Sequence, residues 1–198
     1  MLNSKYWQER YQTNQTGWDA GTITTPIKEY IDQLNNKSIR ILIPGCGNAH
    51  EAAYLWQQGF KNVFLLDYAE APLTNFSNQY PDFPKQQLLL KDFFALDEKF
   101  DLILEQTFFC ALDPQLREAY VEKMHQTLNP EGKLAGVLFN CEFEKQGPPF
   151  GGTKSEYQAL FEGYFDIAKM EECYNSIQPR KGNELFVVLC PKKSVNNA

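Results

Sequence analysis

Short apolar runs alternate along the chain with segments in which apolar residues recur at helical spacing. Runs with the length and composition of buried strands lie at residues 39–43, 62–66, 87–90, 100–105, 133–139, 165–173 and 184–190. Helix-compatible stretches lie between them, at residues 25–34, 48–58, 71–78, 113–127 and 155–164. The alternation predicts an α/β fold with a mostly parallel sheet and helices on both faces. The last two runs are joined by a loop, so we expect an antiparallel hairpin at one edge of the sheet.

Cap and turn residues set the expected boundaries of several elements. Thr25 is a suitable N-cap with Pro26 in the first helical position, and Asp113-Pro114 begins the helix that continues through Thr127. Residues 129–132, Asn-Pro-Glu-Gly, form the expected turn into the strand that starts at Lys133.

The stretch from Ile39 to Glu51 joins a predicted strand to a predicted helix through a G-x-G turn. Gly45 can adopt backbone angles that other residues avoid, and Gly47 allows the main chain to approach a ligand closely. The next predicted strand ends in Asp67, twenty residues after Gly47, where a parallel α/β sheet places the carboxylate that binds a ribose diol. The pattern favours a nucleotide-like ligand. The alternative is a turn that binds nothing.

The residue three positions after Gly47 discriminates between nucleotide ligands. The dinucleotide motif has a third glycine there, whereas this chain has His50. Since the third glycine lets helix and strand pack closely around a pyrophosphate, its absence argues against NAD and FAD. S-adenosylmethionine (SAM) carries an adenosine without a phosphate and suits the turn better. A nicotinamide oxidoreductase is the rival enzyme class.

Aromatic and acidic residues outside the glycine turn each allow two interpretations. Trp7 and Trp18 could cover a bound cofactor as a lid, with cation–π attraction to a sulfonium, or they could cap the core. Asp92, just after the third strand, could accept a hydrogen bond from an adenine amine or be a solvated turn residue. Phe108-Phe109, at the end of the fourth strand, indicates the wall of a buried pocket.

Composition and charge restrict the class of protein. The 198 residues fit one domain, with a lid and first helix in 1–36, an α/β core in 37–191 and a flexible tail in 192–198. The net charge of −6 argues against a nucleic-acid partner, and no apolar run approaches the roughly twenty residues of a membrane span. The N-terminus lacks a signal-peptide core, so we expect a cytoplasmic monomer that acts on a small molecule.

The histidines and cysteines argue against a catalytic metal. His50 and His125 have no neighbours at metal-binding spacing, and the five cysteines include no C-x-x-C pair. An odd number of cysteines in a reducing compartment indicates free thiols. We therefore expect no metal.

Motifs spread over most of the chain occur in the order typical of one enzyme family. They are Trp7 with Arg10, G-W-D-A-G at 17–21 followed by Thr25-Pro26, I-P-G-C-G at 43–47, L-L-D at 65–67, T-F-F-C-A-L-D-P at 107–114, Q-G-P-P-F at 146–150 and P-R-K-G at 179–182. With these motifs the chain resembles a SAM-dependent methyltransferase of the thiopurine S-methyltransferase family, and most of all its halide/thiol methyltransferase branch. As in that family, the position two residues before the first glycine is not acidic; here it is Ile43.

The resemblance implies a Rossmann-like class I methyltransferase fold, with a seven-stranded sheet whose last strand is antiparallel. It also implies SAM as the cofactor, S-adenosylhomocysteine as its product, and SN2 transfer of the methyl group to a small sulfur nucleophile. Such nucleophiles include a thiol, hydrosulfide, thiocyanate or a thiopurine-like compound. The alternatives are a halide methyltransferase and a SAM-binding protein with another small-molecule acceptor.

The resemblance also carries functional roles onto matching positions of this chain. Trp7 and Trp18 would cover the cofactor, Asp67 would hold its ribose, and Asp92 with Phe93 would flank its adenine. The residues expected to contact the cofactor are Trp7, Trp18, Gly45, Gly47, Asn48, Asp67, Tyr68, Asp92, Phe93, Glu105 and Gln106. The residues expected to form the acceptor pocket are Phe108, Phe109, Phe139, Asn140, Phe150 and Arg180.

One position departs from the halide/thiol branch. A tyrosine at the end of the fifth strand helps to order the nucleophile in that branch, and the aligned residue here is Phe139. Without that hydroxyl we expect weak halide methylation and a preference for a larger, polarisable sulfur acceptor. Arg180 and Lys181 would attract an anion or thiolate if their loop reaches the site; otherwise they only solvate the hairpin.

Overall fold

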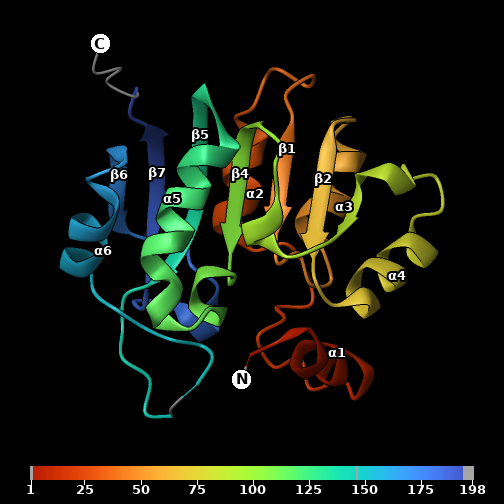
Figure 1. The fold of residues 1–198 in the computed structure, drawn as a ribbon, viewed down its shortest axis with the longest axis horizontal. Coiled ribbons are helices and arrows are strands. Elements are labelled where there is room, and N and C mark those ends of the chain that lie inside the picture. Colours follow the sequence, from red (N-terminus) through yellow and green to blue (C-terminus); the bar gives the residue numbers. More distant parts are fainter. Residues whose placement is uncertain (1, 146, 194–198) are drawn as a thin grey trace.

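A seven-stranded sheet with the order β3-β2-β1-β4-β5-β7-β6 forms the centre of the molecule (Figure 1). The computed structural model describes residues 2–145 and 147–193. Within them the strands are β1 (Ile41–Pro44), β2 (Val63–Asp67), β3 (Leu88–Leu90), β4 (Phe100–Gln106), β5 (Leu128–Phe139), β6 (Phe165–Glu172) and β7 (Glu184–Pro191). The pairings β1–β2, β1–β4, β2–β3 and β4–β5 are parallel, which confirms the predicted class of fold.

The strand order reverses between β1 and β4. The chain moves outward from β1 to β3 and then returns to place β4 on the other side of β1. Open α/β sheets bind ligands outside the carboxyl ends of the strands at such a reversal. The glycine turn after β1 and the loop after β4 therefore flank the expected binding site.

The last two strands form the expected antiparallel hairpin. β7 pairs with both β5 and β6, so it inserts between them and leaves β6 at the edge of the sheet. Because β7 runs opposite to β5, its first residue, Glu184, pairs with Phe139 at the end of β5. The hairpin thus brings the start of β7 to the edge at which the parallel strands end.

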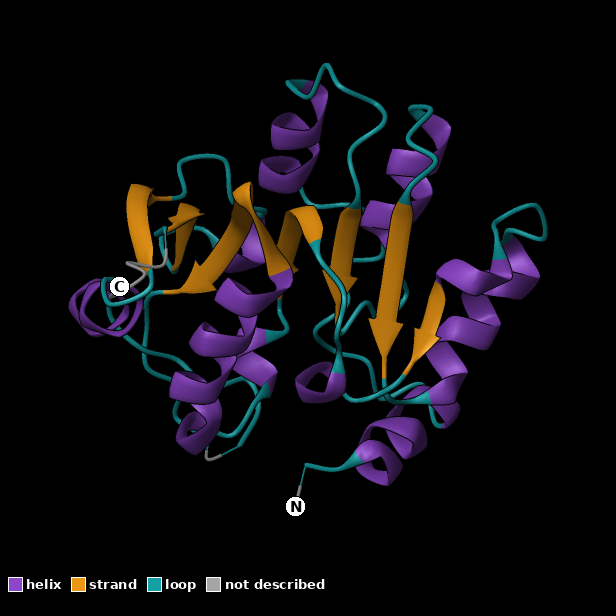
Figure 2. Cartoon of the chain, turned by 45° about the horizontal axis from the view of Figure 1, so that its top comes forward, coloured by secondary structure: helices purple, strands orange, loops and turns teal. Residues whose placement is uncertain are grey.

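Helices cover both faces of the sheet (Figure 2). They are α1 (Ser4–Gln12), α2 (Thr25–Asp32), α3 (His50–Gln57), α4 (Glu70–Gln79), α5 (Arg117–Thr127) and α6 (Lys154–Phe161). One buried cluster joins α2, α3 and α4 to one face, and another joins α5 and α6 to the other. Along β1, Ile41 and Ile43 belong to the first cluster and Leu42 to the second, as alternation along a strand requires. None of the described helices is long and apolar enough to cross a membrane.

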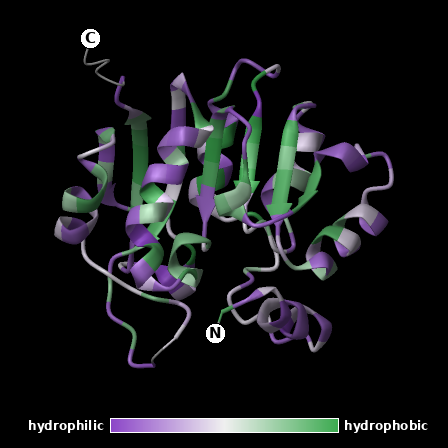
Figure 3. Cartoon of the chain, viewed as in Figure 1, coloured by the Kyte–Doolittle hydropathy of each residue, from purple (hydrophilic) through white to green (hydrophobic). Residues whose placement is uncertain are grey.

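The N-terminal segment contains a helix, α1, that we did not predict from the sequence. The helix follows Asn3, whose side chain accepts a hydrogen bond from the backbone N–H of Tyr6. None of its side chains is fully buried, and Figures 1 and 3 show a largely hydrophilic helix close to the carboxyl ends of β1 and β2. Trp7 and Tyr11 are four residues apart and therefore share one face of α1.

Two helices start at other positions than expected. α3 begins at His50 instead of Asn48, because Gly47 and Ala49 have left-handed backbone angles (φ of 52° and 54°) that an α-helix excludes. The cap of α2 is Thr24 instead of Thr25. Its hydroxyl makes no cap hydrogen bond and donates instead to Gln106 on β4.

The boundaries around β5 also differ from the prediction. The strand already starts at Leu128, which pairs with Phe100, and the next pair in the register joins Lys133 to Leu102. Residues 129–132 are therefore an irregularity within β5 and not a turn before it. Asp113 caps a short 3-10 turn at Pro114–Leu116, and α5 starts only after that turn.

The predicted C-terminal tail is packed at its start. Lys192 donates its backbone N–H to the Tyr164 carbonyl and its ammonium group to the Glu162 carbonyl. The rest of that tail, residues 194–198, lies outside the described residues, as does Gln146 of the Q-G-P-P-F motif.

Candidate active site

The turn after β1 depends on backbone angles that favour glycine. Gly45, Gly47 and Ala49 have φ values of 56°, 52° and 54°. A Cβ atom on Gly45 would collide with the ring of Phe108. A Cβ atom on Gly47 would lie 2.9 Å from the Tyr11 hydroxyl. The two glycines therefore serve both the turn itself and the close approach of side chains from the β4 loop and from α1.

Asp67 ends β2 directly beside this turn. Its side chain is 6% exposed; Oδ1 accepts the Ala69 N–H at 2.9 Å and Oδ2 accepts the Gly47 N–H at 3.3 Å. Burial raises the pKa of Asp67 to about 6, although the backbone hydrogen bonds oppose the shift. The structure thus brings the acid to the glycine turn, as the spacing predicted. Its role toward a ribose stays a prediction.

Aromatic side chains from the N-terminal segment gather over the same turn. The Trp18 ring packs edge-on against Trp7 and Tyr11, with ring centroids 5.4 and 5.7 Å apart. The hydroxyl of Tyr11 lies beside Gly47, and burial raises the pKa of this hydroxyl. The two predicted tryptophans are therefore part of a larger aromatic group that includes Tyr11.

Asp19 fastens the segment after α1 to the start of α3. Its carboxylate accepts hydrogen bonds from the Asn48 side-chain amide and from the Gly21 N–H, and it pairs with His50 Nε2 at 2.8 Å. Burial alone would raise the pKa of Asp19, but these partners together lower it. The Asn48 amide, which we expected at the cofactor, is thus used to hold the N-terminal segment in place.

Glu105 is fully buried near the end of β4 and shapes the loop that follows. One carboxylate oxygen accepts the backbone N–H groups of Phe108 and Phe109 at 2.8 and 2.9 Å. The other accepts the Tyr120 hydroxyl at 2.6 Å. Burial raises the pKa of Glu105 to about 7. The structure gives Glu105 this positioning role, while its expected contact with the cofactor stays a prediction.

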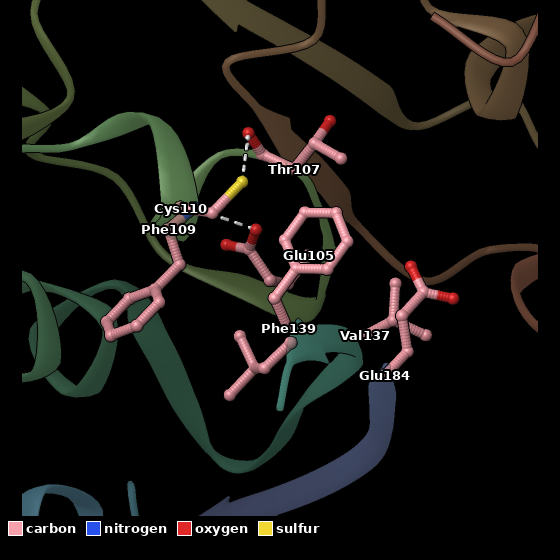
Figure 4. Close-up of a pocket in the computed structure, with 8 residues that line it drawn as sticks. Glu105, Thr107, Phe109, Cys110, Val137, Phe139 and Glu184 are labelled. Carbon is pink, nitrogen blue, oxygen red and sulfur yellow. Dashed lines mark hydrogen bonds between the residues drawn. The ribbon is translucent and has the colours of Figure 1, made fainter. Parts of the chain in front are cut away.

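A small cavity lies where β4 and β5 end and β7 begins (Figure 4). In this view the Phe139 ring lies between the carboxylates of Glu105 and Glu184. Of the residues expected in the acceptor pocket, Phe109 and Phe139 line this cavity. Cys110 and Glu184 also line it, although we did not predict them as pocket residues. The lining residues are Glu105, Thr107, Phe109, Cys110, Val137, Leu138, Phe139 and Glu184.

Arg180 reaches this region from the loop between β6 and β7. Its guanidinium donates to the Trp18 carbonyl at 2.6 Å, lies 3.5 Å from the Glu184 carboxylate and is 5.7 Å from the centroid of the Phe139 ring. The Arg180 side chain is 11% exposed, whereas Lys181 is a surface residue. Of the two basic residues in the P-R-K-G motif, Arg180 therefore approaches the site and Lys181 faces solvent.

Three further cofactor candidates also make contacts within the protein. Asp92 is exposed and accepts the backbone N–H of Phe94. Phe93 is buried, with its ring 5.3 Å from that of Phe108. Tyr68 donates its hydroxyl proton to the Leu2 carbonyl at 2.6 Å, so it ties the N-terminal segment to the end of β2.

Four of the six predicted pocket residues lie outside the lining of the cavity, namely Phe108, Asn140, Phe150 and Arg180, and one cofactor candidate has a spare donor. The side-chain oxygen of Asn140 accepts the Lys154 N–H, and the Phe150 N–H donates to the Cys110 carbonyl. Gln106 uses its oxygen to accept the Thr24 hydroxyl at 2.8 Å. Its buried Nε2 has no hydrogen-bond partner in the described part of the chain.

Comparison with known proteins assigns the chain to a family. The profile described as Thiopurine S-methyltransferase (TPMT) matches residues 2–196. The chain belongs to the thiopurine S-methyltransferase family. Thiocyanate methyltransferase 1 of Brassica oleracea is 30% identical to it over 184 residues, which cover 90% of this chain and 81% of that protein. Thiopurine S-methyltransferase of Vibrio campbellii (strain ATCC BAA-1116) is 26% identical over 181 residues, covering 83% of this chain and 84% of that protein.

The fold is shared beyond the thiopurine S-methyltransferase family. The 1,6-didemethyltoxoflavin-N1-methyltransferase of Burkholderia thailandensis, with bound 1,6-didemethyltoxoflavin and S-adenosylhomocysteine, superposes with a TM-score of 0.77 at 17% identity. The superposition covers 97% of this chain and 88% of that one. At this identity the likeness confirms the Rossmann-like methyltransferase fold alone. Among residues 2–145 and 147–193, no group of three or more His, Cys, Asp or Glu side chains is arranged to hold a metal ion.

Proposed function

We propose that the protein transfers the methyl group of SAM to the sulfur atom of a small acceptor. The observation that carries the proposal is the position of two sites at one edge of the sheet. The glycine turn and Asp67 lie on one side of the loop after β4, and an aromatic cavity approached by Arg180 lies on the other. Bound SAM would supply a methyl group activated by a positively charged sulfonium.

The residues at the glycine turn fit this cofactor. Ionised Asp67 can accept hydrogen bonds from a ribose diol, and Gly45 and Gly47 carry no Cβ atom that would keep a ligand from the main chain. Gln106 Nε2, a donor without a partner in the described residues, can bind a carboxylate such as that of the methionine end. The rings of Trp7 and Trp18 can attract a sulfonium, by about 0.5–2 kcal/mol.

The lining of the cavity suits a polarisable sulfur nucleophile. Its wall includes the side chains of Phe109, Val137 and Phe139, and exclusion of water favours a reaction in which opposite charges meet. Phe139 offers no hydroxyl to a small anion, which supports a sulfur acceptor over a halide. The net charge of −6 supports a small-molecule substrate over a nucleic acid. We also propose that the enzyme is cytoplasmic and monomeric.

An acceptor panel scored by release of S-adenosylhomocysteine tests the proposed function. The panel contains iodide, hydrosulfide, thiocyanate, thiophenol and a thiopurine, assayed with the wild type and with Phe139→Tyr. We expect a sulfur acceptor to have the highest kcat/KM and Phe139→Tyr to raise turnover of iodide. Iodide as the best substrate of the wild type would favour the halide function, and SAM binding without turnover of any acceptor would contradict an enzyme of this class.

A further inference from the structure

We propose that Glu184 accepts the proton of a thiol acceptor during methyl transfer. This inference rests on the S-methyltransferase function proposed above. It assigns a catalytic role to a buried carboxylate in the wall of the acceptor cavity.

The position of Glu184 leaves one oxygen of its carboxylate open to a proton donor. The side chain is 3% exposed and lines the cavity beside Phe139. Arg180 Nη1 pairs with Oε1 at 3.5 Å, which is long for a charge-assisted hydrogen bond, and no described residue donates a hydrogen bond to Oε2. Ser176 Oγ is close enough to lower the pKa of Glu184, yet it forms no hydrogen bond of acceptable geometry with any described residue. The carboxylate therefore keeps lone pairs that an acceptor S–H group can use.

The other carboxylate in the cavity wall already accepts hydrogen bonds from the protein. Glu105 accepts three hydrogen bonds, from two backbone N–H groups of the following loop and from the Tyr120 hydroxyl. Protonation of Glu105 would weaken the contacts that shape the loop carrying Phe108 and Phe109. Glu105 therefore positions the loop, whereas Glu184 is available to the substrate.

The thiol of Cys110 indicates how the cavity affects the ionisation of a thiol group. Cys110 lines the cavity, and burial and the Glu105 carboxylate raise its pKa by more than the nearby Arg180 lowers it. An acceptor thiol in the same place resists ionisation for the same reasons. The small fraction of thiolate that exists in water at neutral pH would therefore not be maintained in the cavity. Burial also raises the pKa of Glu184, which brings its proton affinity closer to that of a thiol.

The proposed step balances without a further reactant. The S–H bond of the acceptor breaks, and its proton moves to an oxygen of Glu184. The electron pair left on the acceptor sulfur forms the bond to the methyl carbon, while the electron pair of the broken carbon–sulfur bond returns to the donor sulfur. Glu184 then releases the proton to water. Thiocyanate is already an anion and needs no base, so the acceptors fall into two classes.

Steady-state kinetics with one acceptor of each class test this role. We compare the wild type, Glu184→Gln, Glu184→Asp and the control Glu172→Gln, an exposed glutamate on β6. Loss of a general base costs about 10²–10⁴-fold, so Glu184→Gln should lower kcat/KM for an aliphatic thiol about 100-fold near neutral pH. The same variant should change kcat/KM for thiocyanate only a few-fold. Glu184→Asp should restore part of the thiol activity, and Glu172→Gln should match the wild type.

The pH profile and a binding measurement separate this role from a structural one. In Glu184→Gln, turnover of the thiol should follow the ionisation of the free thiol, near pH 8.5 for a typical thiol, whereas the wild-type rate should rise at lower pH. Calorimetric titration of thiocyanate into the S-adenosylhomocysteine complex should show unchanged or tighter binding, because a negative charge has been removed from the wall.

Three results would overturn the proposal. They are an equal loss of activity with both acceptors in Glu184→Gln, a weakened binding of thiocyanate in that variant, and unaltered turnover of the thiol. A wild-type protein that methylates neither acceptor would instead contradict the S-methyltransferase function on which the proposal rests.

Discussion

Asp67, the proposed ribose anchor, is a single buried side chain at the end of β2. Burial raises its pKa to about 6, and a ribose diol donates to the ionised form. SAM affinity should therefore increase as the pH rises through about 6 and fall about tenfold per pH unit below that value. Calorimetric titrations of SAM between about pH 5 and pH 8 measure this dependence.

Removal of the Asp67 carboxylate tests its assignment as the ribose anchor. Hydrogen bonds to a charged group contribute about 1.5–3 kcal/mol each, so Asp67→Ala should weaken SAM binding tenfold or more. Asp67→Asn should also remove the pH dependence near 6. An Asp67→Ala protein that is folded by circular dichroism and binds SAM with unchanged affinity would contradict the assignment.

Gly47 combines a left-handed backbone with close approach of the Tyr11 hydroxyl and, in the proposed function, of the cofactor, and Gly59 provides a matched control. Both have positive φ values, 52° and 89°, but a Cβ atom on Gly59 would meet nothing within 4 Å. Alanine at either position should cost about 1–2 kcal/mol of stability from backbone strain. Gly47→Ala alone should weaken SAM binding, by about tenfold or more. Equal SAM affinity of the two variants, measured by calorimetry, would remove Gly47 from the site.

At the scale of elements, polar side chains attach the N-terminal segment to the core on two sides. Asp19 joins it to the start of α3, and the Trp18 carbonyl accepts a hydrogen bond from Arg180 on the β6–β7 loop. The segment therefore connects the glycine turn to the cavity lined by Phe139 and Glu184. Movement of this segment should affect both ends of the site.

Arg180→Ala tests this connection, with Lys181→Ala as the control. Loss of the guanidinium frees the Trp18 carbonyl and leaves Glu184 buried without its ionic partner, which should destabilise the protein by about 3 kcal/mol. Amide hydrogen exchange of residues 15–21 should become faster. Lys181 is exposed, so its variant should behave as the wild type. Equal exchange rates in the two variants would show that Arg180 does not hold the segment.

At the scale of the whole molecule, buried acids make stability decrease as the pH rises. The pKa of Asp67 is raised from 3.8 to about 6 and that of Glu105 from 4.5 to about 7, in both cases by burial. The folded state thus binds protons more tightly than the unfolded chain, and the free energy of unfolding should fall between about pH 4 and pH 7. Urea unfolding of the wild type and Glu105→Gln measures the slope. In the variant, the fall in the free energy of unfolding over this pH interval should be smaller by up to ~3 kcal/mol. A wild-type stability that increases over the interval would contradict this prediction.

The sequence predicts the sheet and the glycine turn because those features are local. Strand composition, the G-x-G spacing and the acid at the end of β2 can each be read along the chain, and the structure brings Gly47 and Asp67 together. Glu184 could not be placed in this way, since its position depends on β7 inserting between β5 and β6. The start of α3 was misplaced because Ala49, a good helix former, has a left-handed backbone in the turn.

The most direct test of the S-methyltransferase function uses one acceptor that carries both a thiol and a hydroxyl group, such as a mercaptophenol. The protein is incubated with SAM and this acceptor, and mass spectrometry with NMR locates the methyl group and quantifies S-adenosylhomocysteine. We predict a methyl group on sulfur alone, in an amount equal to the S-adenosylhomocysteine released. Methylation of the oxygen, or release of S-adenosylhomocysteine without an S-methyl product, would contradict the proposed function.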